Sequence, residues 1–263
     1  MDLAFFANVG VLFEPVTKDD WDEKTLTQLF AHNIQQRDTQ QVDPQQQTQG
    51  TGVLGRMADA LTLGGYNTGS YSLAGEIYSL IGVEEAAAVT QVEPWDDPEF
   101  NPASSLNGIE STMFDINNPT SIDSSGIYGT TWSQMFEPYV RKTESLREAL
   151  ESTQTGVTFP ESMVGKSLQK VAELMKTSST IGDDRQMFHV KDVLYDTHGG
   201  NDYDSDRLQQ LNEAISSFVQ EMKGIGMWEN VVLMCASDFG RTLTPNTSGG
   251  TDHGWGGKIM LST

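Results

Sequence analysis

Aspartate and histidine residues in three short motifs of the second half of the chain could bind a metal ion. Asp196 and His198 lie in the segment YDTHGGN, Asp238 lies in SDFGRT, and Asp252 and His253 open the segment DHGWGG. Carboxylate oxygens and imidazole nitrogens are the ligand types that suit zinc, manganese and iron in proteins. The motifs therefore predict one site for a divalent metal, provided that the fold brings them together.

Two predicted strands lead into these motifs. Residues 231–236 (VVLMCA) form a continuous apolar run, which is typical of a strand covered on both faces, and Asp238 follows closely. Residues 186–193 predict a second strand, which is followed by Asp196 and His198. Since ligands collect at the carboxyl ends of strands in open α/β sheets, both motifs would stand where such sites occur.

A helix is predicted between the two strands. From Arg207 onward, apolar residues recur at helical spacing with polar residues between them, and Gly224 and Gly226 would end the helix. The face expected to be buried consists of Leu208, Leu211, Ile215, Phe218 and Met222.

The whole chain, residues 1–263, is predicted to form a single α/β domain. Residues 83–165 would be an irregular insertion within it, whose Pro-, Asn- and Ser-rich part would cover the site as a lid. The domain would be incomplete at both ends, because the chain opens directly on one core strand and stops within another. Further predicted elements are a parallel strand at Leu3–Val9, helices at 17–30 (with Thr17 as N-cap), 52–63, 132–151 and 167–176, and a strand or hairpin within 66–82.

The combination of LYDTHGGN, SDFGRT and DHGWGG resembles the domain of unknown function 1501 family, which belongs to the alkaline-phosphatase and sulfatase superfamily. The resemblance implies a mostly parallel sheet sandwiched by helices, in a protein exported to the periplasm or the extracellular space. It further implies metal-dependent hydrolysis of a small anionic ester, a phosphate or a sulfate. Zinc or manganese would be bound by Asp196, His198, Asp238 and His253.

The roles of three further residues stay open. Asp252 either orients His253 or joins the metal ligands. Arg241 either pairs with Asp238 or Asp252, or binds the oxyanion of the substrate, which its planar guanidinium group suits. His32 lies in FAHNIQQ, a segment that also fits the family, and it either faces the site as a catalytic residue or points away.

Two departures from the family pattern favour a different interpretation. Ala31 stands where related sequences often have serine, which leaves the nucleophile unidentified, and Phe239 stands where many superfamily members have a histidine ligand. The alternative hypothesis is a non-catalytic, exported binding or assembly protein of the same fold. A third hypothesis is that the chain binds cations or polysaccharide at an acidic surface and holds no transition metal. A separate alternative for Asp196 and His198 is that the aspartate caps a turn and the histidine satisfies a buried hydrogen bond.

Composition narrows the choice of partners. With 37 acidic and 16 basic residues the net charge is −21, which argues against binding to nucleic acid or to an anionic membrane surface. No apolar stretch predicts a membrane span, and no signal peptide is seen. The single Cys235 excludes an intrachain disulfide, and the sequence leaves the oligomeric state open.

Overall fold

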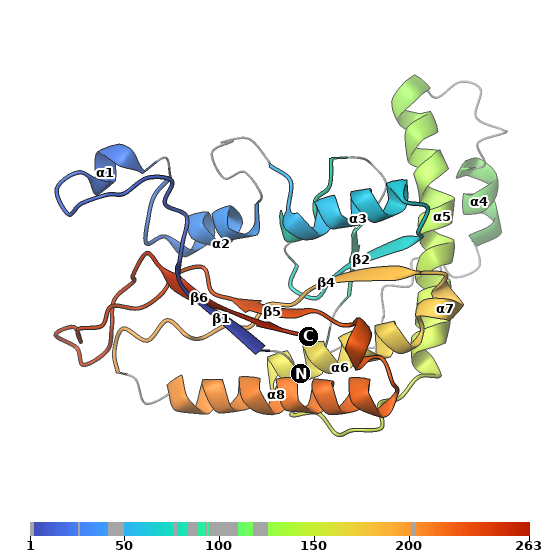
Figure 1. The fold of residues 1–263 in the computed structure, drawn as a ribbon. Helices are drawn as coiled ribbons and strands as arrows, with labels where there is room; N and C mark the ends of the chain where they lie inside the picture. The colour runs from blue at the N-terminus through green and yellow to red at the C-terminus, as the bar shows by residue number, and fades with distance from the viewer. Residues whose placement is uncertain are drawn as a thin grey trace.

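The chain forms an α/β structure in which helices pack against two three-stranded sheets, as the computed structural model shows (Figure 1). The helices α6 and α8 run along one side of the strands, and α2 and α3 lie on the other side (Figure 1). The structure describes residues 3–25, 27–41, 50–75, 78–83, 89–92, 94, 110–117, 126–200 and 204–263.

The sheet that leads into the predicted site is antiparallel. Its strand order is β1–β6–β5, with β1 at Leu3–Val9, β6 at Gly257–Ser262 and β5 at Leu233–Ala236. Leu3 pairs with Ser262, so the two ends of the chain lie side by side (Figure 1). The prediction of a mostly parallel sheet is therefore wrong for this half of the fold, as is the prediction that Leu3–Val9 is a parallel strand.

Burial of this sheet is also lower than the apolar run in β5 predicts. Leu233 packs against the main core, but Val232 and Met234 are 69% and 55% exposed, and every residue of β1 is exposed. Only one face of β5 is thus covered, because residues of alternate parity point to opposite sides of a strand. The prediction of a strand buried on both faces is wrong.

The second sheet is parallel, as expected for an α/β fold. Its central strand β2, Thr68–Ser72, lies between β3, Val89–Gln91, and β4, Arg185–His189. Tyr71 on β2 is fully buried and stacks on Phe188 of β4 with ring centroids 5.5 Å apart. The region predicted as a strand or hairpin within 66–82 contains this one strand, and β4 covers the first part of the strand predicted at 186–193.

Helices form where the apolar periodicity is strongest, with one exception. The stretch predicted as a helix at 17–30 is helical only at Trp21–Lys24, because Thr25 is extended and Phe30 is left-handed. Thr17 and Asp20 bond to one another ahead of this short helix. The helices are α1 Trp21–Lys24, α2 His32–Gln40, α3 Val53–Leu63, α4 Glu110–Asn117, α5 Gly126–Glu151, α6 Met163–Lys176, α7 Ser178–Ile181 and α8 Asp204–Gly224, with 3-10 turns at Tyr78–Leu80 and Trp228–Asn230.

The main core joins α6 and α8 to strands of both sheets. Ala172 and Leu174 of α6 and Phe218 and Met222 of α8 are buried in it, while a smaller cluster packs α3 against the other side of β4. Leu208 was predicted to be buried, yet it is 56% exposed, because the contacts of α8 with the core begin at Leu211.

The predicted insertion at 83–165 is only partly described. Its described part includes α4 and the long helix α5, which contains the helix predicted at 132–151. The predicted lid falls largely on residues outside the described ranges. Among the helices that the structure describes, none is both long and apolar enough to cross a membrane.

Glu221, which the sequence pattern places on the polar face of α8, is instead buried with 3% of its surface exposed. Its carboxylate accepts hydrogen bonds from the backbone N–H groups of Gly156 and Val157 at 2.8 and 2.9 Å, and from Lys176 Nζ at 2.9 Å. Burial alone would raise the pKa of Glu221, but these bonds lower it below the ordinary value of 4.5. Glu221 therefore fastens α8 to α6 and to the loop before α6.

Replacing Glu221 with glutamine is expected to lower the free energy of unfolding at pH 7 by about 1–3 kcal/mol, since a charged acceptor is lost. The folded-state pKa is lower than the unfolded one, so the stabilisation is present above pH 4.5 and disappears as the pH falls through the folded-state value. Urea unfolding at pH 7 and at about pH 3 should show the difference between the two proteins shrinking at acid pH. The exposed Glu213→Gln on the same helix is the control, and an equal loss there would contradict this role.

Candidate functional site

Three segments that are distant in sequence meet at one end of the molecule. They are the start of α2, the loop after β4 and the loop that joins β5 to β6, which lie close to one another in Figure 1. The two loops touch at Gly250, where an added Cβ would lie 2.4 Å from the carbonyl oxygen of Thr197. Only glycine permits this approach, which holds the residues after Thr197 against those before Asp252.

Three of the four histidines surround one carboxylate, that of Asp196. His253 Nε2 lies 2.8 Å from Asp196 Oδ1, and His198 Nε2 lies 3.0 Å from the same oxygen. His32 Nε2 lies 3.3 Å from the other oxygen, Oδ2. The side chain of Asp196 is 40% exposed, so this cluster opens to solvent.

The opposite nitrogen of each of these rings is held by an acceptor. Phe30 O lies 2.6 Å from His253 Nδ1, and Asp252 Oδ1 lies 3.1 Å from His198 Nδ1. Asp238 Oδ2 lies 2.7 Å from His32 Nδ1. A carbonyl or carboxylate oxygen can only accept, so each Nδ1 carries a proton and each neutral ring has its lone pair at Nε2. Metal-binding histidines are commonly oriented by this arrangement.

The close contact between the Nε2 atoms of His198 and His253 is favourable only if a positive charge lies between these atoms and Asp196. His198 Nε2 and His253 Nε2 are 2.9 Å apart, and neither two lone pairs nor two N–H groups can face one another favourably at that distance. A proton on one ring or a shared cation resolves the contact. His32 Nε2 is buried and lies 3.3 Å from Asp196 Oδ2, within ion-pair distance but without hydrogen-bond geometry in the described structure. The donor set of this cluster fits a metal ion.

Asp196 is held as an anion by its neighbours. Burial raises the pKa of Asp196, but contacts with His253, Arg241 and His32 lower it to about 2. Arg241 donates to Asp196 Oδ1 from Nη1, and its Nε and Nη2 donate to Oγ1 and the carbonyl of Thr251. Arg241 therefore pairs with Asp196, and not with Asp238 or Asp252 as the sequence suggested.

Asp252 orients a ring of the cluster. Its Oδ1 accepts from Asn246 Nδ2 at 3.0 Å and lies beside His198 Nδ1, and both contacts hold its pKa below the ordinary range. Asn246 also donates to the carbonyl of His198. Asp252 thus contacts His198, whereas the sequence pointed to His253.

Asp238 lies on the far side of the His32 ring from Asp196. Its Oδ2 contacts His32 Nδ1 and accepts from Gln36 Nε2 at 3.3 Å, while Oδ1 accepts from the N–H of Phe239. From this position Asp238 holds His32 in place and does not share the space between the Nε2 atoms. His32, which the sequence left undecided, takes the place predicted for Asp238: the ligand atoms of His32, Asp196 and His253 all lie within 4.8 Å of one another.

Phe239 forms an apolar wall of the cluster. Its ring centroid lies 4.3 Å from that of His253 and 4.6 Å from that of His32, and Phe239 is 4% exposed. An apolar wall lowers the local dielectric and strengthens the attraction between the cluster's charges.

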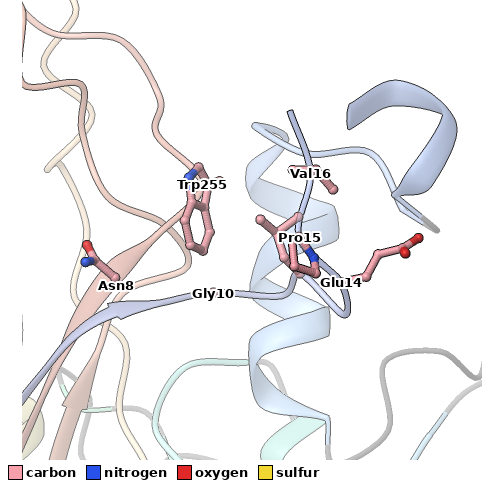
Figure 2. Close-up of a pocket in the computed structure, with 7 residues that line it drawn as sticks. Asn8, Gly10, Glu14, Pro15, Val16 and Trp255 are labelled. Carbon is pink, nitrogen blue, oxygen red and sulfur yellow. The ribbon is translucent and has the colours of Figure 1, made fainter. Parts of the chain in front are cut away.

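A pocket of about 340 Å³ is lined by residues near the start of the chain and by Trp255. Trp255, two residues after His253, forms part of its wall, and Figure 2 shows the indole between Asn8 and Pro15, close to Gly10. An added Cβ on Gly10 would lie 2.8 Å from Trp255 Cε3, so the ring rests on a backbone that carries no side chain. The lining residues are Asn8, Gly10, Leu12, Glu14, Pro15, Val16 and Trp255.

Sequence reasoning missed several residues that support the cluster. The carbonyl of Phe30 is a backbone group and leaves no signal in the sequence. Asn246 and Gln36 donate to Asp252 and Asp238, respectively. Gln36 could have been noticed, since it lies one helical turn after His32 and helix residues four apart share a face.

The fold and the cluster define an α/β protein that carries three histidines around one carboxylate at its surface. The chain belongs to the family described as Protein of unknown function (DUF1501), whose model matches residues 16–262 and so includes every residue of the cluster. No curated protein and no solved structure matches the chain.

Proposed function

We propose that the chain binds a divalent transition metal and uses it to hydrolyse a phosphate or sulfate ester. The ligands are His32, His198, His253 and Asp196. The observation that carries the proposal is the shared orientation of the three rings, each held at Nδ1 and turned with Nε2 toward Asp196. The ester chemistry and an alkaline-phosphatase-like fold rest on the family resemblance of the three motifs.

The ligand atoms of His32, Asp196 and His253 all lie within 4.8 Å of one another, a spacing that suits one cation, and His198 approaches the same carboxylate. Two atoms each about 2.1 Å from an ion lie about 3.0 Å apart at a right angle and about 3.4 Å apart at the tetrahedral angle. The Nε2 atoms lie between 2.8 and 3.3 Å from the nearer oxygen of Asp196. Nitrogen-rich sites of this kind favour zinc over magnesium or calcium.

When bound, such a metal polarises the ester and lowers the pKa of an attacking water or hydroxyl group. The chain's own residues would hold the reacting group in place. Arg241 uses three of its five N–H groups within the described structure, which leaves two for an oxyanion of the ester. Because the chain as a whole is acidic, the positive charge of the metal ion and of Arg241 would be needed to attract an anionic substrate.

The second candidate is a non-catalytic exported binding or assembly protein that retains the metal site. Two observations favour it. Ala31, next to His32, offers no hydroxyl nucleophile, and Phe239 fills the space beside His32 and His253 with an apolar ring. In this case the metal would stabilise the joined loops and take no part in a reaction.

Calorimetric titration with zinc and manganese, beside an assay with chromogenic phosphate and sulfate monoesters, tests the proposal. Wild-type protein should bind one metal ion and turn over one ester class, and His198→Ala should lose both. The control is His189→Ala on β4, which should keep the wild-type affinity. Metal binding without turnover would support the non-catalytic candidate, and unchanged binding by His198→Ala would remove His198 from the proposed ligands.

A further inference from the structure

Residues 30–32 form a corner that serves two of the three imidazoles. His32 is the first residue of α2 and enters the cluster directly. The carbonyl of Phe30, two residues earlier, accepts from His253 Nδ1 at 2.6 Å. The positions of His32 and His253 therefore depend on the conformation of one short piece of backbone.

That backbone is in a conformation that non-glycine residues rarely adopt. Phe30 has φ 66°, in the left-handed region. Ala31 is the N-cap of α2 and has no side chain that could bond to the start of the helix. The corner must be held by groups other than these two side chains, since strained backbone persists only where its surroundings fix it.

Gln35 supplies the bond that holds the corner. Its side chain is completely buried, and its Oε1 accepts from the backbone N–H of Phe30 at 2.9 Å. The same peptide segment thus donates to Gln35 at one end and accepts from His253 at the other. Trp21 adds an edge contact to the Phe30 ring, with centroids 5.5 Å apart.

We propose that Gln35 is a positioning residue of the metal centre. It fixes Phe30 in the left-handed conformation, which directs the Phe30 carbonyl at His253 Nδ1 and places His32 at the start of α2. The expected effect of Gln35 on metal affinity rests on the proposed metal binding. The expected effect of Gln35 on the position of His253 is independent of any metal.

A purely structural role for Gln35 predicts a different result. Loss of a buried hydrogen bond would then lower the melting temperature and leave the affinity of the folded protein unchanged. Positioning predicts weaker metal binding by folded protein, because groups that orient metal-binding histidines typically contribute about 10- to 100-fold to affinity.

The experiment compares Gln35→Met, which keeps the length of the side chain but removes the acceptor, with Gln35→Glu, which keeps an acceptor oxygen. Zinc affinity is measured by calorimetry on protein shown to be folded by circular dichroism. Gln35→Met should bind zinc about 10- to 100-fold more weakly, and Gln35→Glu should stay within about threefold of wild type. The control is Gln41→Met, a buried glutamine at the other end of α2, which should keep the wild-type affinity.

A second measurement needs no metal. Nitrogen-15 NMR of histidine-labelled, metal-free protein should show His253 protonated at Nδ1 in wild type and Gln35→Glu, and a mixture of tautomers in Gln35→Met. An unchanged His253 tautomer in Gln35→Met overturns the inference, as does wild-type zinc affinity in that variant. If wild-type protein binds no zinc, the proposed function fails, and the tautomer measurement still decides the role of Gln35.

Discussion

Replacing His253 with alanine is expected to weaken zinc binding by at least about 100-fold, more than the loss of an orienting group costs. Its Nε2 lies closest to Asp196 and within 2.9 Å of His198 Nε2, so its loss opens the centre of the cluster. Calorimetric titration of folded protein at constant pH measures the effect.

The companion variant Asp238→Asn separates ligands from orienting groups. Its amide oxygen can still accept from His32 Nδ1, so the expected loss of zinc affinity is about 10-fold. A loss at Asp238 as large as that at His253 would show that Asp238 is itself a ligand, as the sequence motifs suggest, and that the site rearranges on binding. Equal affinity of His253→Ala and wild type would place any bound zinc elsewhere.

Replacing Phe218 with alanine is expected to destabilise the fold by about 3–5 kcal/mol. The Phe218 side chain is 3% exposed and packs in the core cluster that joins α8 to α6, so its removal leaves a cavity that rigid neighbours cannot fill. Urea unfolding at neutral pH, followed by circular dichroism, measures the change in the free energy of unfolding.

Leu208 provides the matched control on the same helix. It belongs to the same apolar series in the sequence but is 56% exposed, so Leu208→Ala should change the free energy of unfolding by less than about 0.5 kcal/mol. Similar losses at Phe218 and Leu208 would show that the first turns of α8 are also covered in solution.

Helices could be predicted from the sequence because their signal is local. Spacing of apolar residues identified α3, α6 and α8 and, on α8, the buried positions Phe218 and Met222. The apolar pattern failed at positions whose burial is determined by tertiary contacts. Leu208 lies beyond the edge of the core, and the charged Glu221 is buried because it meets two backbone N–H groups and Lys176.

Strand direction and coverage could not be predicted in the same way. An apolar run such as 231–236 predicts a strand in a sheet, but it does not show whether both faces of that strand are covered. Both β1 and β5 pair with β6, and β6 lies far from β1 in the sequence. Two of the four strand pairings among the described residues are therefore antiparallel where a parallel sheet was expected.

For the site, the sequence predicted the residue types but not each role. The spacing of motifs brought Asp196, His198 and His253 to one expected centre, and the structure places them in contact. Asp238 and His32 lie at different distances from the centre of the cluster because His32 turns Nε2 toward Asp196 and Nδ1 toward Asp238. That orientation is set by three-dimensional packing, and by a backbone carbonyl that no side-chain pattern encodes.

The contact between Phe30 and His253 joins residues 223 positions apart, and the strand pairing of β1 with β6 spans a still longer stretch. Contacts of such long range form slowly, because closing a large loop costs chain entropy before the contact repays it. A chain still emerging from the ribosome carries His32 and Asp196 long before it carries His253. The cluster therefore cannot assemble before His253 has emerged from the ribosome, and a metal ion could be captured by all of the proposed ligands only after that point.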